Sequence, residues 1–552
     1  GGAVARSESY DYVIVGAGSA GAVIAARLTE DPATRVLLLE AGGPADADEI
    51  SIPAAFSTLF KTRWDWNYTT TEQKQLHSTR KYWPRMKALG GCSSMNAMIY
   101  IRGNRADYDT WRDQYGAVGW GYDDVLPYFI RSEANTRLGA PYHGRQGPLH
   151  VEDRRYTHPL SEAWVESAVA NGMKPTDDFN GAEQEGAGLY QVTCKKGRRW
   201  SVDKAYLQPA TGRQNLTVRT GALASRVLVE DGRAVAVAYL RGSEELVAYV
   251  DREVVLCGGA VNSPQLLMLS GIGPAAHLRD VGVEVVHDLP GVGQNLHDHP
   301  AVPLVWHTKD TTDLAEYNNL LNFGRAKTLG SGPLVSNVGE AGAFFRSRDD
   351  LGAPDLQVHF APSGFWDNGL HEPTTRKLTV APTLVNVSSR GQIRLRSTDP
   401  RWHPEIDPAY YDDQADLDAM VAGAQRLIET VQTGPLARYV DRPFIPGVAT
   451  PSESDLVDLV RTHTQTLYHP VGTCAMGTGE QAVVDPELRV RGIEGLRVAD
   501  ASVIPMVTRG NTNAPTIMIG EKAADLLSAP AGREHAVTTN EAVTTGETEV
   551  RR

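Results

Sequence analysis

Two short apolar runs near the start of the chain enclose a glycine-rich turn and an alanine-rich segment. The first run, YDYVIV, occupies residues 10–15, and the second, RVLLLE, occupies residues 35–40. Between them lie GAGSAG and an apolar stretch that reaches Leu28, after which Asp31-Pro32 favours a helix end. A strand, a helix and a second strand within about thirty residues predict a βαβ unit.

Alternating apolar and polar positions in the middle of the chain predict two further groups of strands. Segments 216–221, 225–231, 234–240 and 253–259 predict a β-rich insertion that returns to a buried strand. Segments 356–362, 377–385 and 391–397 predict a second sheet, and residues 414–432 predict a helix.

Two other segments lack such periodicity. Residues 50–85 are rich in aromatic and polar side chains, and a loop of this length is typically functional. After Leu527 the chain has few large apolar residues and many Thr, Glu and Gly, so residues 531–552 are predicted to form a disordered tail.

Composition places the chain among ordinary globular proteins and argues against several classes of function. The 552 residues are 41% hydrophobic and 22% charged, and a chain of this length buries several cores. The net charge is −13 and no long basic run is present, so we expect no nucleic-acid partner. No apolar run approaches ~18 residues and the N-terminal stretch lacks a signal-peptide pattern, so we expect no transmembrane segment.

The cysteines are few and far apart. Cys92, Cys194, Cys257 and Cys474 include no CxxC pair, which argues against a zinc ribbon, a dithiol redox motif and a disulfide framework. We therefore expect a reducing, cytoplasmic location and no metal cofactor, and association with a membrane surface stays open.

The turn between the first two predicted strands carries a dinucleotide-binding fingerprint. Gly16, Gly18 and Gly21 form GxGxxG at the mouth of the predicted helix, where the helix N-terminus favours a phosphate group. Glu40 ends the next strand, where a carboxylate binds ribose hydroxyls. The pattern predicts a bound nucleotide but does not separate FAD from NAD. A flavoprotein that is reduced by NADPH usually has a second unit of this kind. Only one is present in this sequence, so we expect the electrons to come from the substrate itself.

Further motifs follow one another along residues 10–528. Segment 89–96 reads LGGCSSMN and precedes Tyr100, and segment 259–273 reads GAVNSPQLLMLSGIG. Later motifs are PGVGQNL at 290–296, YHPVGT at 468–473, GLRVADAS at 495–502 and GNTNAPT at 510–516. In this order they resemble the glucose–methanol–choline (GMC) oxidoreductases, in particular the choline dehydrogenase and aliphatic alcohol dehydrogenase branch.

The resemblance implies an α/β fold with two domains. A Rossmann-like FAD-binding domain is expected to be discontinuous, over residues 1–157, 200–303 and 466–530. A substrate domain built on an antiparallel sheet is expected to be inserted in it, over residues 158–199 and 304–465.

The same resemblance implies FAD as the cofactor. Choline oxidases have a histidine, covalently bonded to the flavin, at the place of Met95, and methionine cannot form that bond, so we predict non-covalent FAD. The residues expected at the cofactor are Gly16, Gly18, Ser19, Gly21, Glu40, Ala41, Gly90, Gly91, Ser94, Asn96, Ala97, Met98, Val227, Asp500, Ala501, Asn511 and Thr512.

Oxidation of an alcohol requires removal of the hydroxyl proton and transfer of the α-hydride to flavin N5. A group that titrates near neutral pH suits the proton. By resemblance, His469 and Asn511 are the His–Asn pair of the family. His469 is expected to act as the base or to stabilise the alkoxide, and Asn511 to hold the substrate oxygen by a hydrogen bond.

The segment His297-Asp298-His299 has three interpretations. Two histidines two residues apart share one face of a strand, but no third ligand stands at a characteristic spacing for a metal. Structural packing and lining of the flavin pocket are the alternatives to a metal site.

A second open question is the charge of the substrate. Glu340 is a candidate ligand for a cation such as choline, and Phe365, Trp366 and Tyr468, with Trp64 and Trp66, are candidates for an aromatic cage. The alternative is that backbone amides hold Glu340 and that the aromatic rings belong to the core or to a lid.

The leading hypothesis is FAD-dependent oxidation of a primary alcohol to an aldehyde. The alternatives are oxidation of choline to betaine aldehyde, a non-redox lyase that resembles hydroxynitrile lyases, and a non-catalytic flavin protein. The expected partners are a small alcohol and an electron acceptor, which is oxygen, a quinone or a carrier protein. A homodimer is also possible.

Overall fold

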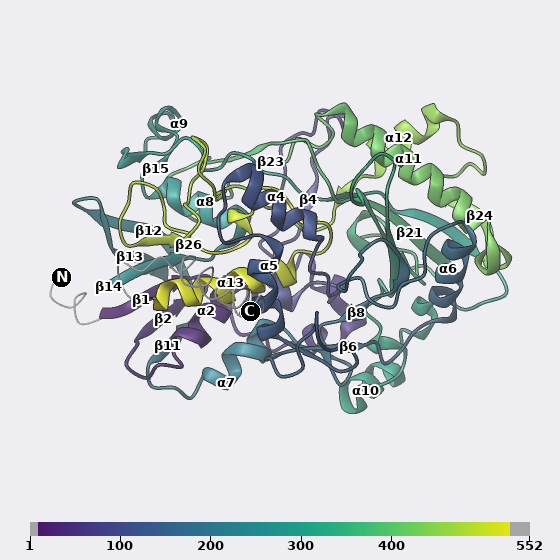
Figure 1. Cartoon of the computed structure of the whole chain (residues 1–552), viewed down its shortest axis with the longest axis horizontal. Helices are drawn as coiled ribbons and strands as arrows, with labels where there is room; N and C mark the ends of the chain where they lie inside the picture. Colours follow the sequence, from purple (N-terminus) through teal and green to yellow (C-terminus); the bar gives the residue numbers. More distant parts are fainter. Residues whose placement is uncertain (1–8, 530–552) are drawn as a thin grey trace, which may run out of the picture.

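The protein, seen in a computed structural model, contains two large β-sheets that lie side by side along its long axis (Figure 1). The structure describes residues 9–529. The predicted tail, residues 531–552, falls outside the described residues. The mixed α/β fold expected from the sequence is confirmed.

The first sheet has seven strands and receives the N-terminal βαβ unit. Its strands are β11 (Leu216–Arg219), β2 (Val36–Leu39), β1 (Ser9–Val15), β14 (Glu244–Leu256), β13 (Arg233–Arg241) and β12 (Ala222–Glu230) in spatial order, and β26 (Leu496–Val498) pairs with β14. Strands β11, β2, β1, β14 and β26 are parallel, whereas β12 and β13 form an antiparallel hairpin. All residues of β2 are buried, which explains its unbroken apolar sequence.

Helices cover this sheet. Helix α2 (Gly21–Leu28) follows β1 as predicted, and α13 (Asn513–Ser528) packs against it although nearly the whole chain lies between them. Helices α4 (Arg105–Tyr115), α5 (Tyr122–Ser132) and α8 (Gly259–Leu269) also belong to this part. Strand β14 ends at Leu256, so the last three residues of predicted strand 253–259 form the turn into α8 and the first residue of that helix.

The second sheet has eight strands, and all of its pairings are antiparallel. Its spatial order is β24 (Val440–Ile445), β18 (Leu304–Thr308), β21 (Lys377–Leu384), β20 (Leu356–Ala361), β19 (Ala341–Phe345) and β7 (Gly186–Leu189), with β17 (Pro300–Ala301) and β25 (Gln465–Thr466) beside β21. Strands β17 and β25 belong to this sheet and lie next to the boundaries predicted between the two domains, near residues 303 and 466. The division into two domains stays a prediction.

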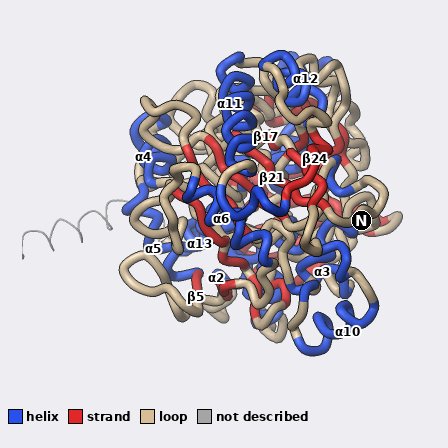
Figure 2. The backbone as a smooth tube through the Cα atoms, turned by 90° about the vertical axis from the view of Figure 1, so that its right-hand side faces the viewer, coloured by secondary structure: helices blue, strands red, loops and turns tan. Residues whose placement is uncertain are grey.

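Helices α6 (Pro159–Ala170) and α11 (Gln414–Val431) pack on the second sheet, and α12 (Glu453–His463) packs on α11. Helix α11 confirms the helix predicted over residues 414–432, and Figure 2 shows α6 and α11 in front of the strands. Predicted strand 391–397 does not join this sheet. It forms β22 (Gln392–Arg394), which pairs only with β23 (Glu405–Asp407), because alternation predicts a strand but not its partner.

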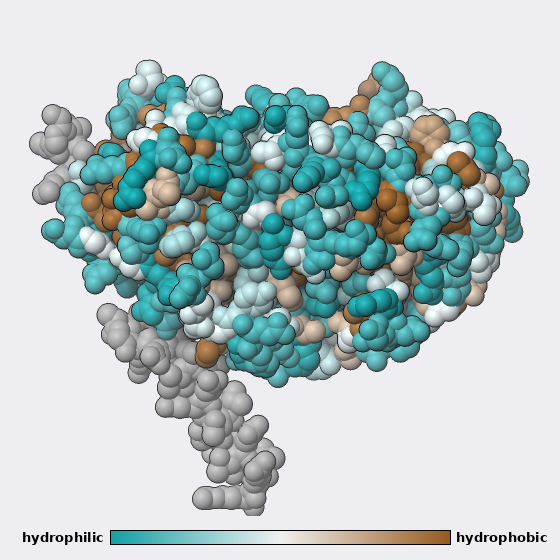
Figure 3. Space-filling view, turned by 90° about the horizontal axis from the view of Figure 1, so that it is seen from above, coloured by the Kyte–Doolittle hydropathy of each residue, from teal (hydrophilic) through white to brown (hydrophobic). Residues whose placement is uncertain are grey.

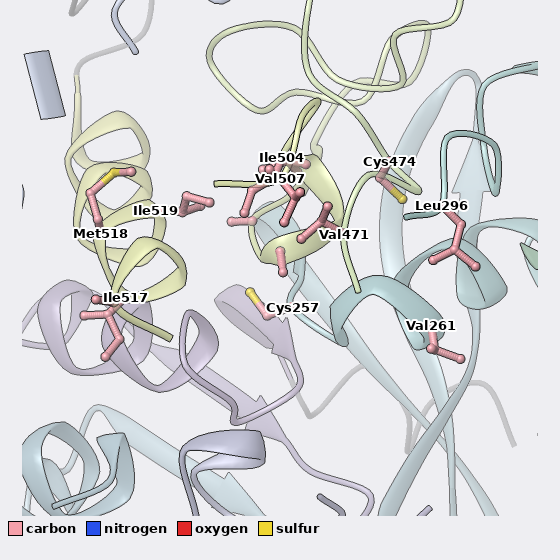
Figure 4. Close-up of a cluster of buried hydrophobic side chains, with 14 of the residues drawn as sticks. Cys257, Val261, Leu296, Val471, Cys474, Ile504, Val507, Ile517, Met518 and Ile519 are labelled. Atoms are coloured by element: carbon pink, nitrogen blue, oxygen red, sulfur yellow. The ribbon is translucent and has the colours of Figure 1, made fainter. Parts of the chain in front are cut away.

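Segments distant in sequence meet in the interior. Figure 4 shows Cys257, Val471, Cys474, Val507 and Ile517 in one buried cluster. The face in Figure 3 is mainly hydrophilic with scattered apolar residues. Within residues 9–529, no helix is both long and apolar enough to cross a membrane.

Candidate active site

The turn after β1 is built so that only glycine fits at two of its positions. Gly16 has φ +105°, a conformation that favours glycine. A Cβ at Gly21 would lie 1.8 Å from the carbonyl oxygen of Gly16, so the helix approaches the turn more closely than any side chain allows. The turn therefore has the geometry in which a helix N-terminus faces a phosphate group.

Glu40 lies at the end of β2, beside this turn. Its Oε1 accepts a hydrogen bond from Ala17 N (3.1 Å) and its Oε2 from Gly42 N (2.8 Å). Burial raises the pKa of Glu40 to about 7, and the two amides oppose that shift. The carboxylate is held rigidly at the place where a ribose is expected.

A second glycine turn packs directly on the first. Gly90 N donates to Ala17 O (2.8 Å), and a Cβ at Gly91 would lie 2.6 Å from the Cα of Gly18. The two turns thus form a cradle that side chains would fill. Ser94 Oγ donates to Leu89 O (2.8 Å) and stabilises the second turn.

One large cavity starts at this cradle and extends to strands β20 and β21 in the middle of the second sheet. The residues predicted at the site that line this cavity are Gly16, Gly18, Ser19, Glu40, Ala41, Gly91, Asn96, Ala97, Met98, Phe365, Tyr468, His469, Asp500, Ala501, Asn511 and Thr512. They come from segments spread over almost five hundred residues, and the fold brings them together.

Four of the residues expected at the cofactor do not line the cavity. Gly21, Gly90 and Ser94 belong to the two turns and shape them from behind. Val227 lies farther along β12, where its N–H donates to Ser270 Oγ (2.8 Å). The cavity is lined instead by Ala222–Ala224, at the start of the same strand.

His469 lies at the far end of the cavity, and its backbone is held by Asp298. Asp298 Oδ1 accepts from His469 N (2.9 Å), and its Oδ2 accepts from Tyr410 OH (2.5 Å) and Thr466 Oγ1 (2.6 Å). Tyr468, immediately before His469, has φ +72°. These bonds hold a strained backbone that turns the imidazole toward the cavity.

Burial lowers the pKa of His469 well below its ordinary value, and His299, His359 and Arg85 add to the shift. The imidazole is therefore neutral at neutral pH. A neutral imidazole has a free lone pair, which a proton acceptor requires.

Asn511 stands at the same end of the cavity, and its amide orientation is determined by two neighbours. Gln357 Nε2 donates to Asn511 Oδ1 (3.1 Å), so the Asn511 nitrogen points the other way. This Nδ2 lies 3.5 Å from His359 Nε2. His359 Nδ1 in turn lies 3.0 Å from Thr383 Oγ1. The Asn511 amide can thus act as a hydrogen-bond donor in the cavity.

The three residues of the His-Asp-His segment have separate structural roles. His297 Nδ1 lies 2.7 Å from Asn295 O and its Nε2 accepts from Val507 N (3.0 Å), so both ring nitrogens are occupied. His299 Nδ1 lies 2.9 Å from His469 Nδ1. Within residues 9–529, no cluster of three or more His, Cys, Asp or Glu residues is arranged to hold a metal ion. The contacts favour the packing interpretation of this segment.

Glu340 does not reach the cavity. Its Oε1 accepts from His158 N (2.8 Å) and Ser161 Oγ (2.7 Å), and its Oε2 accepts from Ser336 Oγ (2.5 Å). The side chain is fully buried at the N-terminus of α6. Its oxygens accept hydrogen bonds from one backbone amide and two serine hydroxyls. This arrangement favours the alternative in which the protein itself, and not a cationic substrate, holds Glu340.

Aromatic side chains line the cavity near His469. Phe56 and Phe60 come from the aperiodic segment 50–85, and Phe60 lies 5.5 Å from Tyr468 between ring centroids. Trp66 also lines the cavity, whereas Trp64 does not. Trp366 stacks on His371 at 3.5 Å and lies away from the cavity.

Several lining residues were not singled out from the sequence: Phe56, Phe60, Arg85 and His359. Arg85 donates to Tyr468 O (3.1 Å). His359 lies in β20, which was predicted as a strand, and it shares a face with Gln357. Two polar residues at alternate positions of an apolar strand were the signal that could have found this face.

Three comparisons with known proteins agree with this geometry. Profiles of the N-terminal and C-terminal parts of the family described as GMC oxidoreductase match residues 10–301 and 387–520. The chain therefore belongs to the GMC oxidoreductase family and is an oxidoreductase.

Three relatives span nearly the whole chain. An "alcohol dehydrogenase [acceptor]" of Pseudomonas putida is 42% identical, over 94% of this chain and 95% of its own. An "oxygen-dependent choline dehydrogenase" of Burkholderia ambifaria is 43% identical, over 94% of each chain. The crystal structure of pyridoxine 4-oxidase from Mesorbium loti superposes with a TM-score of 0.86 at 30% identity, over 94% of this chain and 98% of that one.

The cofactor of this oxidoreductase is FAD, and the site fits it. The glycine cradle leaves room for a pyrophosphate against backbone, and Glu40 is held beside it. Met95 lines the same cavity and carries no group that bonds covalently to a flavin, which is consistent with non-covalent binding.

Proposed function

We propose that the protein oxidises a primary alcohol to an aldehyde. The observation that supports this most directly is that His469 and Asn511, both beside His359, line the same cavity as the glycine cradle. FAD bound at the glycine cradle would supply the two-electron acceptor for the hydride of the alcohol carbon. The protein's own task is to bind the alcohol, orient it and remove the hydroxyl proton.

His469 is the proposed acceptor of that proton. Burial and the neighbouring groups keep its imidazole neutral, so it enters the reaction with a lone pair available. The proton leaves the alcohol oxygen for the imidazole while the hydride leaves the adjacent carbon, and the carbon–oxygen bond becomes a carbonyl.

Asn511 is the proposed donor to the substrate oxygen. Because Gln357 occupies its carbonyl oxygen, the amide nitrogen is free to donate both to His359 and to a substrate. A donor fixed in this way before the substrate arrives orients the hydroxyl without reorganisation during the reaction.

The cavity wall favours an alcohol with an apolar or aromatic body. Phe56, Phe60, Phe365 and Tyr468 line it near His469. Choline is the less favoured substrate, because Glu340 is occupied by protein donors and lies outside the cavity. The proposed acceptor of the electrons is oxygen, a quinone or a carrier protein. The proposed location is the reducing cytoplasm, which the four free cysteines support.

The proposal is tested with an anaerobic visible spectrum of the purified holoprotein. Benzylic, furanic and aliphatic alcohols, sugars and choline are added in turn, and we expect the flavin band near ~450 nm to bleach with apolar or aromatic primary alcohols. Bleaching with choline alone would contradict the substrate class. If no alcohol bleaches the flavin and a cyanohydrin releases cyanide, the protein is a lyase instead.

The role of His469 is tested with His469→Ala. We expect FAD to stay bound and the rate of flavin reduction to fall by about a hundredfold or more. The FAD content of the variant, measured by its absorbance, is the control. An unchanged rate of reduction at full FAD content would exclude His469 from the mechanism.

A further inference from the structure

His299 is a buried histidine that touches His469 from outside the cavity. It is completely shielded from solvent and precedes β17 directly. The two Nδ1 atoms lie 2.9 Å apart, and the rings meet edge to face at 86°. At this distance one nitrogen carries a hydrogen and the other accepts it.

The base role proposed for His469 determines which of the two Nδ1 atoms is the donor. His299 Nε2 forms no hydrogen bond of ordinary geometry with any residue in 9–529. Burial lowers the pKa of His299 to about 3, and the backbone carbonyls of Thr508 and Val385 oppose that shift. A residue that takes a proton from a substrate in the cavity needs its lone pair on Nε2, because Nδ1 of His469 faces His299. In that state Nδ1 of His469 carries the hydrogen, and Nδ1 of His299 accepts it.

We propose that His299 is a positioning residue that holds His469 in the tautomer with hydrogen on Nδ1 and a lone pair on Nε2. This inference rests on the proposed function, in which His469 takes the proton of the alcohol. In the opposite tautomer the nitrogen available to the substrate would carry a hydrogen, and His469 would be unable to act as a base.

The contact also stabilises the product of proton transfer. When His469 Nε2 takes the hydroxyl proton, the ring becomes an imidazolium whose Nδ1–H still donates to His299. A hydrogen bond from a charged donor is stronger than one from a neutral donor. In this proposal the proton stays on His469, and His299 only accepts the hydrogen bond from Nδ1–H.

The other groups that face His469 do not replace this contact. They are His359 and Arg85, which disfavour positive charge on its ring, and Asp298, which binds its backbone N–H. Asp298 is itself held by Tyr410 and Thr466. Within residues 9–529, His299 is the residue that forms a hydrogen bond with the ring of His469.

The test compares His299→Leu with His299→Asn, both isolated with bound FAD. Asparagine places its amide oxygen near the position of Nδ1 and can accept from His469, whereas leucine cannot. We expect His299→Leu to slow anaerobic flavin reduction by about tenfold to hundredfold with little change in substrate affinity. We expect His299→Asn to recover most of that rate.

A pH profile of flavin reduction separates positioning from a structural role. The substitution His299→Leu removes both the acceptor of Nδ1–H and a group that lowers the pKa of His469, so the acidic limb should move in His299→Leu and return toward its original position in His299→Asn. The inference is overturned if the rate of flavin reduction falls equally in both variants. It is also overturned if a lower FAD content or a lower melting temperature alone explains the slower reduction. His469→Ala is measured beside them. If His469→Ala is slow and His299→Leu is not, only the inference fails, whereas an unchanged His469→Ala means that the proposed function fails.

Discussion

At the scale of single residues, burial determines the protonation of the site. His299 and His359 have pKa values lowered to about 3 by burial, and His469 is shifted in the same direction. Each ring is therefore neutral, and its tautomer depends on its neighbours. A spacing pattern in the sequence contains no information on solvent access, so these shifts could not be predicted from it.

The pH dependence of the reaction follows from the lowered pKa of His469. A group with a depressed pKa stays deprotonated until the pH falls through that lower value, so the base form is complete both above and somewhat below the ordinary value of 6.5. We expect the rate of anaerobic flavin reduction to be level as the pH falls through 6.5 and to decline only under more acidic conditions. A midpoint near 6.5, at constant FAD content, would contradict the burial of this ring.

The side chain of Met95 determines how the flavin is retained. Met95 lines the cavity, and a thioether does not form the bond that a histidine forms with a flavin. We expect acid precipitation to release the yellow colour into the supernatant. A yellow pellet after washing would show a covalent link and would locate it at another residue.

At the scale of elements, the cofactor end of the site depends on close approach between backbones. The turn after β1, the start of α2 and the turn at Gly90–Gly91 are in contact through atoms that leave no room for side chains. The local pattern of strand, glycine turn and helix predicted the first of these. The contact of Gly91 with Gly18 joins two segments more than seventy residues apart, and the pattern did not contain it.

Gly21→Ala tests this close approach. The new Cβ would lie 1.8 Å from Gly16 O, so the turn must open and we expect FAD binding to be lost or greatly weakened. Gly43→Ala is the matched control, because a Cβ there meets no atom within 4 Å and its effect should stay within about 0.5 kcal/mol. FAD content and the dissociation constant of FAD are measured for both variants. Normal FAD binding in Gly21→Ala would contradict the role of the turn.

At the scale of the whole molecule, the two ends of the described chain are joined beside the cofactor site. Figure 1 shows α2, near the N-terminus, next to α13, near the C-terminus. Tyr12 OH donates to Leu527 O (2.9 Å), and the fully buried Glu521 binds Arg27, Arg131 and Tyr206. Helix α13 thus joins the two ends of the described chain, and its residues Asn513 and Thr516 also line the cavity.

Glu521→Gln tests how much this junction contributes. The amide nitrogen would face arginine donors, so we expect the free energy of unfolding to fall by about 1–3 kcal/mol, with earlier loss of FAD on heating. Asp123→Asn is the control, since Asp123 forms an exposed ion pair with Arg105 and its loss should leave the melting temperature almost unchanged. The two melting temperatures are compared at equal FAD content. Equal effects of the two substitutions would exclude a special contribution of the buried carboxylate.

The sequence by itself determined the βαβ opening, the glycine turn, helix 414–432 and the motifs of the GMC family, because these depend on local backbone conformation and short-range periodicity. Only the tertiary structure decided which polar and aromatic side chains reach the cavity. By residue type, Glu340 and Trp366 were candidates for binding a cationic substrate. In the structure, Glu340 accepts a hydrogen bond from the start of α6 and Trp366 stacks on His371. His359 and His299 reach the end of the cavity and the ring of His469, because strands far apart in sequence pack there. Packing between distant segments determines such contacts, and no local pattern encodes them.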